Sequence, residues 1–127
     1  MYSFKKSERL CNKSIINSLY ASDKRLIEYP LSAHWLILDQ NSNPDRLQVL
    51  IVVPKRKLHH AVDRNRTKRL MRECYRHRKE RLLNALEKCN TNMALGINYL
   101  HNATPDFHRL ENSFDKLFDN IINELAK

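Results

Sequence analysis

The chain has 127 residues, of which 23 are Lys or Arg and 14 are Asp or Glu, so its formal net charge is +9 at pH 7. This length predicts one domain, residues 1–127, and excludes a second. The three cysteines, Cys11, Cys74 and Cys89, exclude a disulfide framework and a zinc knuckle by their odd number and wide spacing, and predict small core residues of a reduced protein. No window approaches the roughly 18 apolar residues of a membrane span, so we expect a soluble, cytoplasmic protein with no membrane partner.

The chain begins with residues that predict a basic, irregular arm over 1–11, followed by a short helix that Asn12 can cap and that runs to about Ala21. Two pairs of apolar residues in this helix lie four apart: Ile15 with Leu19, and Ile16 with Tyr20. They form two adjacent stripes, of which one can face the core while the other lines a different surface. Periodicity alone favours the burial of both.

Residues 31–39 and 46–53 predict two strands that form a hairpin through a loop over Asn41–Asp45. The second run is apolar on both faces, which predicts a central strand rather than an edge strand. Pro54 has no backbone N–H to donate, so it should end this strand at Val53.

The stretch Pro54–Arg81 holds twelve bases and three acids, so it alone carries +9 and leaves the rest of the chain neutral. A helix should begin near Ala61 and run to about Arg78, with a continuation or a second short helix over 82–87. Its core stripe is at the helical spacing: Thr67, Leu70, Met71 and Cys74. Bases four apart on one flank, Arg64, Lys68, Arg72 and Arg76, repel one another, which favours a phosphate-bearing partner over a merely solvated face.

Residues 91–100 alternate apolar with smaller or polar side chains and predict a third strand, in which Gly96 marks a close backbone approach. Thr104 and Pro105 then predict the cap and the first residue of a final helix. Its apolar stripe continues at the helical period to Leu125. The order of elements predicts an α+β fold, a small sheet packed with helices.

No catalytic or metal-binding constellation is evident. His59 and His60 are adjacent and point in different directions, the carboxylates are scattered, and there is neither an HExxH motif nor a glycine-rich phosphate loop. This argues against a free-standing metallonuclease. A non-enzymatic RNA- or DNA-binding protein, such as a ribosomal-like module, stays open as the alternative, and a preference for duplex DNA over structured RNA would favour it.

The run Ala61–Glu73, AVDRNRTKRLMRE, resembles the signature of the bacterial ribonuclease P protein subunit family: an RNR core, then KR and RE at fixed offsets, with a basic KRK segment before it. The resemblance extends along nearly the whole chain. It implies a fold shared with some ribosomal protein domains, in which a small mixed sheet is packed with helices and a left-handed βαβ crossover surrounds the signature helix.

The resemblance also implies a function. Family proteins bind a catalytic RNA and the 5′ leader of precursor tRNA and assist the removal of that leader. In that family the RNA carries the chemistry, with Mg²⁺ held mainly by RNA and substrate, so we expect the chain to be the non-catalytic subunit of an endonuclease. Expected partners are this RNA and precursor tRNA, with no protein partner.

Carried over residue by residue, the RNA-binding set is Lys55, Arg56, Lys57, Arg64, Asn65, Arg66, Lys68, Arg69, Arg72 and Arg76. The family's leader cleft corresponds to Ile16 and Tyr20, with Trp35 as a further aromatic candidate. Ile16 stands where phenylalanine is common and cannot stack like a ring. Leu50 and Pro54 replace a glycine and a small residue, and both departures indicate altered packing near the cleft.

Overall fold

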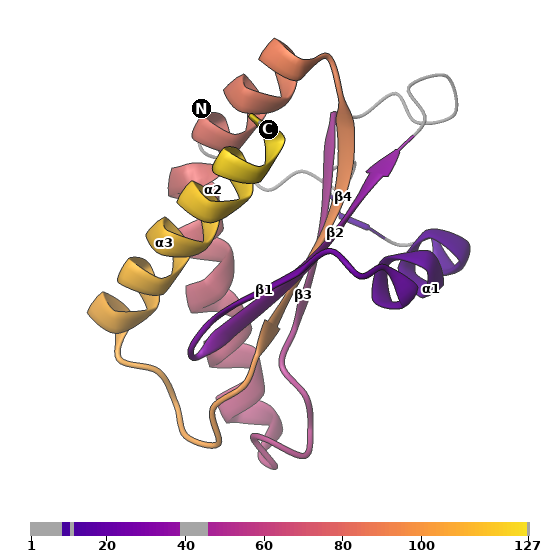
Figure 1. The fold of residues 1–127 in the computed structure, drawn as a ribbon. Helices are drawn as coiled ribbons and strands as arrows, with labels where there is room; N and C mark the ends of the chain where they lie inside the picture. Colours follow the sequence, from indigo (N-terminus) through magenta and orange to yellow (C-terminus); the bar gives the residue numbers. More distant parts are fainter. Residues whose placement is uncertain (1–8, 11, 39–45, 127) are drawn as a thin grey trace.

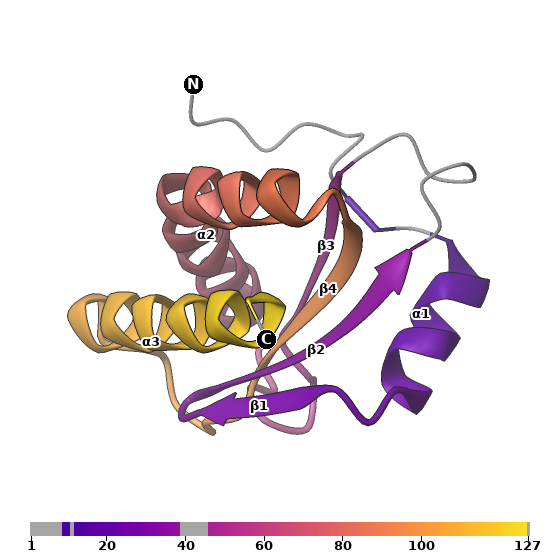
Figure 2. The ribbon, with the colours of Figure 1, turned by 45° about the horizontal axis from the view of Figure 1, so that its top comes forward.

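The computed structural model describes residues 9, 10, 12–38 and 46–126. They form α1 (Lys13–Ala21), β1 (Arg25–Glu28), β2 (Leu31–Leu38), β3 (Leu47–Val52), α2 (Ala61–Cys89), β4 (Asn92–Tyr99) and α3 (Phe107–Leu125). The helices α2 and α3 cover one face of a single sheet, and α1 lies against the other (Figures 1 and 2). The predicted α+β fold is therefore confirmed.

The four strands lie in the order β1-β2-β4-β3. The pairs β1–β2 and β2–β4 are antiparallel, whereas β3 and β4 are parallel, with Leu50 opposite Gly96. The unit β3–α2–β4 is thus a crossover between neighbouring parallel strands, the arrangement that the resemblance implies for the signature helix. Its left-handed sense stays a prediction.

The predicted hairpin is wrong, because β4 lies between β2 and β3 and pairs with both. Its loop, Asn41–Asp45, falls outside the described residues. The prediction that β3 is central is also wrong, since β3 is the last strand of the order. Two residues of the predicted basic arm lie along the outer edge of β3. Arg9 forms a parallel bridge with Val49, and the Leu10 N–H donates to the Val49 carbonyl at 2.9 Å. Residues 1–8 and 11 of that arm fall outside the described residues.

The main core lies between the sheet and the pair α2–α3. The stripe of α3 is buried as predicted, with Leu110, Phe114, Leu117, Phe118 and Ile121 all fully covered. On α2 the stripe Thr67, Met71 and Cys74 is buried and Leu70 is half-buried. The helix α2 continues without a break to Cys89, so the first of the two predicted alternatives is confirmed.

Two smaller expectations need correction. The cap of α3 is Asp106, whose carboxylate accepts from the Arg109 N–H at 3.3 Å, so the helix begins beyond Thr104 and Pro105. Cys74 is buried as predicted, whereas Cys89 is exposed, and Cys11 falls outside the described residues. None of the described helices combines the length and apolar character that a membrane crossing requires.

The helix α1 packs against β4 at the only glycine of the chain. A Cβ added at Gly96 would lie 3.0 Å from Leu19 Cδ2, so the predicted close approach is confirmed. Leu19 is fully buried, whereas Tyr20 is 40% exposed. The two stripes therefore separate: one anchors α1 to the sheet, and the other, Ile16 and Tyr20, faces a groove. The cap is as predicted, with Asn12 Oδ1 accepting from the Ile15 N–H at 3.2 Å.

Candidate nucleic-acid interface

The N-terminal half of α2 presents most of the predicted RNA-binding side chains to solvent. Exposed members of the set are Asn65, Arg66, Arg69 and Arg72, while Lys68 is half-buried. A guanidinium group can hold a phosphate with two donors of its planar fork, and an amide can bond phosphate, sugar or base. This half of α2 therefore has exposed side chains that can bind a polyanion.

Arg64 has a structural role in the same region. Its Nη1 donates to the carbonyls of Leu58 at 2.9 Å and His59 at 2.7 Å, which ties the segment before α2 to the first turn of the helix. That segment also folds on itself, because the Lys57 and Leu58 N–H groups both donate to the Pro54 carbonyl. The basic KRK segment is thus held in a turn beside the start of α2.

The C-terminal part of the basic stretch is neutralised within the protein. Arg78 lies 3.1 Å from Glu111 and 2.7 Å from Asp115, and Arg81 lies 3.2 Å from Asp119. Burial acts to lower the pKa of Arg78, but its hydrogen bonds to Asp115 and Glu111 raise that pKa on balance. These carboxylates belong to α3, so the second half of α2 uses its charge to hold the helix pair together.

Arg76 marks the boundary between the two halves. Its guanidinium donates to the Glu73 carboxylate, which also contacts His77 Nε2 at 3.0 Å. Hydrogen bonds from Arg76 and His77 lower the pKa of Glu73. Of the predicted set, Arg76 therefore carries charge that a neighbouring acid already offsets.

A groove of about 590 Å³ lies on the α1 side of the sheet. It is lined by Ile16, Tyr20, Arg25, Ser32, His34, Leu50, Val52, Pro54, Arg56, Lys57, Asn98, Tyr99 and Leu100. The groove therefore joins two predicted regions, the outer stripe of α1 and the basic segment before α2. Among the described residues that line the groove, three have basic side chains and none is Asp or Glu. This charge suits a phosphate-bearing strand.

Trp35 does not line this groove. It is only 4% exposed and packs in the core on the α2–α3 face, because side chains alternate along β2. The neighbour on the groove face is His34, which sequence reasoning missed although the same alternation identifies it.

Tyr20 and His34 form the aromatic floor of the groove. Their ring centroids are 5.0 Å apart with the planes inclined at 58°. The Tyr20 hydroxyl donates to Asn98 Oδ1 at 2.8 Å, which fixes the ring on β4. Burial raises the pKa of Tyr20, whereas burial, aided by the charge of Arg25, lowers the pKa of His34. Both rings are thus held neutral near pH 7 and can accept a stacked base.

Leu50 and Pro54, the two departures from the family pattern, also line this groove. Leu50 lies opposite Gly96 across the β3–β4 pair, and it packs against the small cluster around Leu19. Leu50 and Pro54 therefore change the wall of the groove, whereas the exposed basic side chains of α2 lie elsewhere.

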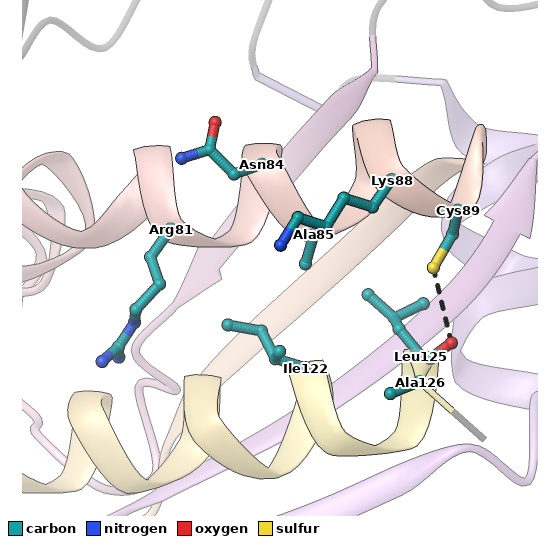
Figure 3. Close-up of a pocket in the computed structure, with 8 residues that line it drawn as sticks. All are labelled: Arg81, Asn84, Ala85, Lys88, Cys89, Ile122, Leu125 and Ala126. Atoms are coloured by element: carbon teal, nitrogen blue, oxygen red, sulfur yellow. Dashed lines mark hydrogen bonds between the residues drawn. The ribbon is translucent and has the colours of Figure 1, made fainter.

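A second hollow, about 550 Å³ in volume, lies between the C-terminal ends of α2 and α3 (Figure 3). Its lining includes Ala85, Ile122 and Leu125, and the Cys89 thiol donates to the Leu125 carbonyl at 3.5 Å. None of the predicted site residues lines it. Within the described part of the chain, no cluster of three or more His, Cys, Asp or Glu side chains could hold a metal ion.

Comparison with known proteins identifies the family. Residues 4–122 match the family model described as ribonuclease P. A ribonuclease P protein component from Porphyromonas gingivalis is 30% identical over 115 residues, which cover 91% of this chain and 83% of that protein. Another from Chlorobium phaeobacteroides is 31% identical over 134 residues, which cover 98% of this chain and 92% of that protein.

The solved structure of the Staphylococcus aureus RNase P protein shares the fold, with a TM-score of 0.70 over 91% of this chain and 96% of that chain at 16% identity. Sequence and fold comparisons thus agree on the same family. The chain belongs to the ribonuclease P protein family.

Proposed function

We propose that this chain, as the protein subunit of ribonuclease P, binds the catalytic RNA with the N-terminal half of α2 and binds the 5′ leader of precursor tRNA in the groove beside α1. The observation that carries the proposal is the basic segment before α2. Arg56 and Lys57 line the groove, and a few residues later the same segment enters α2, where the exposed basic side chains lie. One surface can therefore hold the catalytic RNA and its substrate side by side.

The groove suits an unpaired strand better than a duplex. Tyr20 and His34 are the neighbouring aromatic rings of the groove, and stacking of nucleotide bases on such rings is worth about 1–3 kcal/mol per base without sequence preference. Arg25, Arg56 and Lys57 lie where the phosphates of the same strand would pass. Leader sequences that differ widely can therefore bind the same site.

The chain assists the reaction by binding rather than by chemistry. Catalytic RNA and precursor tRNA are both polyanions, so they repel each other and need counterions to associate. A protein of charge +9 reduces that repulsion, and the Mg²⁺ requirement should fall accordingly. We assign the Mg²⁺ of the hydrolysis to RNA and substrate, because the described lining of the groove offers it no carboxylate.

Reconstitution tests the proposal. Full-length protein is combined with its cognate catalytic RNA at low Mg²⁺, and the cleavage of precursor tRNA is followed. Protein should raise the rate well above that of RNA alone, and an unchanged rate would refute the proposal.

A second measurement tests the groove separately. Tyr20→Ala should weaken the binding of precursor tRNA but not of mature tRNA, which has no leader. Ile37→Ala serves as control, because Ile37 is 49% exposed on β2 and does not line the groove.

A further inference from the structure

A second aromatic site lies at the end of the sheet, beyond the groove. It is formed by Tyr29, at the turn between β1 and β2, and by His101 and Arg109, which follow β4. The hollow between them has a volume of about 180 Å³. None of the predicted RNA-binding or leader-cleft residues belongs to it.

The strand register explains how these residues meet. Glu28 pairs with Leu31 across β1–β2, and Leu31 pairs with Tyr99 across β2–β4. The turn that carries Tyr29 and the segment that follows β4 therefore lie at the same end of the sheet, as Figure 1 shows. Tyr99, the last residue of β4, lines both the groove on the α1 face and this hollow beside the start of α3, so the two meet around the end of the sheet.

Tyr29 is held in place although it is exposed. Its hydroxyl lies 2.7 Å from His101 Nδ1, and the Arg109 guanidinium carbon lies 5.7 Å from the ring centroid. The ring is nevertheless 50% exposed. An exposed tyrosine usually loses side-chain entropy when a ligand binds, whereas this ring is already ordered by two partners, which favours binding.

The charges around the hollow favour the binding of a nucleotide base over the binding of a phosphate. Asp106 lies in the lining and caps α3 by accepting from the Arg109 N–H. Its carboxylate would repel a phosphate but can accept from the amino group of a base. Arg109 supplies a planar cation that can stack on a base or hold the phosphate next to it.

We propose that Tyr29, His101 and Arg109 form a second stacking site that takes one unpaired RNA nucleotide outside the groove. The inference rests on the proposed function, because it takes the chain as the RNA-binding subunit of ribonuclease P. Two sources can supply the nucleotide: the leader, where it leaves the groove, or an unpaired loop of the catalytic RNA. The proximity of the groove favours the leader.

The test uses the reconstituted holoenzyme and precursor tRNAs whose leaders grow by one nucleotide at a time. Tyr29→Ala should leave the affinity for short leaders unchanged and lower it about fivefold or more once the leader reaches the site. Tyr29→Phe keeps the ring and should bind like the wild type. Ile37→Ala removes an equally exposed apolar side chain from the far part of β2 and serves as the control.

The outcomes are distinguishable. A loss of affinity for the catalytic RNA itself, whatever the leader length, would support the site and identify that RNA as the source. If Tyr29→Ala changes neither affinity while Tyr20→Ala weakens leader binding, the second site is refuted and the groove stands. If Tyr20→Ala also has no effect, the groove assignment fails as well. Thermal unfolding of each variant shows that the fold is intact.

Discussion

Removing the two exposed guanidinium groups of Arg69 and Arg72 tests where the catalytic RNA binds. Each phosphate that the protein no longer neutralises should lower the slope of log affinity against log salt by about 0.7 to 0.9, because fewer counterions are released. Two such phosphates change the slope by about 1.4 to 1.8. Between about 50 and 200 mM salt, the advantage of the wild type over Arg69→Ala/Arg72→Ala should therefore shrink about 7- to 12-fold.

The assay is an equilibrium titration of the catalytic RNA with full-length protein over that range of salt. Lys88→Ala/Lys116→Ala removes the same charge from two exposed positions on the C-terminal part of α2 and on α3, and should change the slope by less than half as much. Arg81→Ala/Asp119→Ala removes an ion pair at constant net charge and should leave the slope unaltered.

Two results would contradict the reasoning. If the Arg69/Arg72 variant keeps the wild-type slope, these side chains do not neutralise phosphates. If the lysine control changes the slope equally, only the net charge matters, and no particular face of α2 is the binding surface.

Further predictions concern stability and the groove. Phe118→Ala should lower the unfolding free energy in urea by about 3–5 kcal/mol, because Phe118 is fully buried and packs edge-on against two aromatic rings. Arg78→Ala should cost about 1–3 kcal/mol in the same assay, since it removes the largely buried guanidinium that binds both Glu111 and Asp115, whereas Arg81→Ala, at a more exposed pair, should cost less than about 1 kcal/mol. Burial raises the pKa of the Cys74 thiol to about 12, so this thiol should reduce stability as the pH rises from its ordinary pKa of 9.0 toward 12, and Cys74→Ala should flatten that decline. Ile16→Phe adds a ring to the groove and should raise the preference of the holoenzyme for precursor over mature tRNA about fivefold or more.

Each has an opposing result. A cost well below about 3 kcal/mol for Phe118→Ala would mean that the core closes around the missing ring. If Arg78→Ala and Arg81→Ala lowered the unfolding free energy equally, burial would not determine how much these ion pairs contribute to stability. A decline in stability between pH 9 and 12 that is the same with and without Cys74 would exclude the thiol as a cause. An unchanged tRNA preference after Ile16→Phe would show that position 16 does not touch the leader.

Local patterns predict the helices well. The spacing of Phe114 and Phe118, and of Met71 and Cys74, reflects the period that any amphipathic helix needs, so burial follows from sequence. The division of α1 into an anchoring stripe and a groove stripe depends on how closely α1 approaches the sheet. That approach is permitted by Gly96, whose importance the sequence indicates only weakly.

Strand pairing does not follow from the sequence in the same way. A hairpin between β2 and β3 is locally plausible, but β4 arrives from a distant part of the chain and pairs with both. The sequence does not indicate β1, because its four residues, Arg25–Glu28, show no clear alternation and are defined by pairing with β2. The prediction for Trp35 is wrong because the face of a strand is settled only when the layers on either side are known.

The partial neutralisation of α2 limits how the helix can bind. On the proposed surface, an RNA backbone that follows α2 from its first turn meets exposed basic side chains as far as Arg72. It then meets the carboxylates of α3, Glu111, Asp115 and Asp119. Those acids already pair with Arg78 and Arg81, so this part of the helix pair offers the next phosphates much less positive charge. A uniformly basic helix would let an RNA bind along it in many positions, whereas the second half of α2 has much of its charge paired with α3. We therefore expect the ion pairs that join α2 to α3 to limit the registers in which the catalytic RNA can bind the proposed surface.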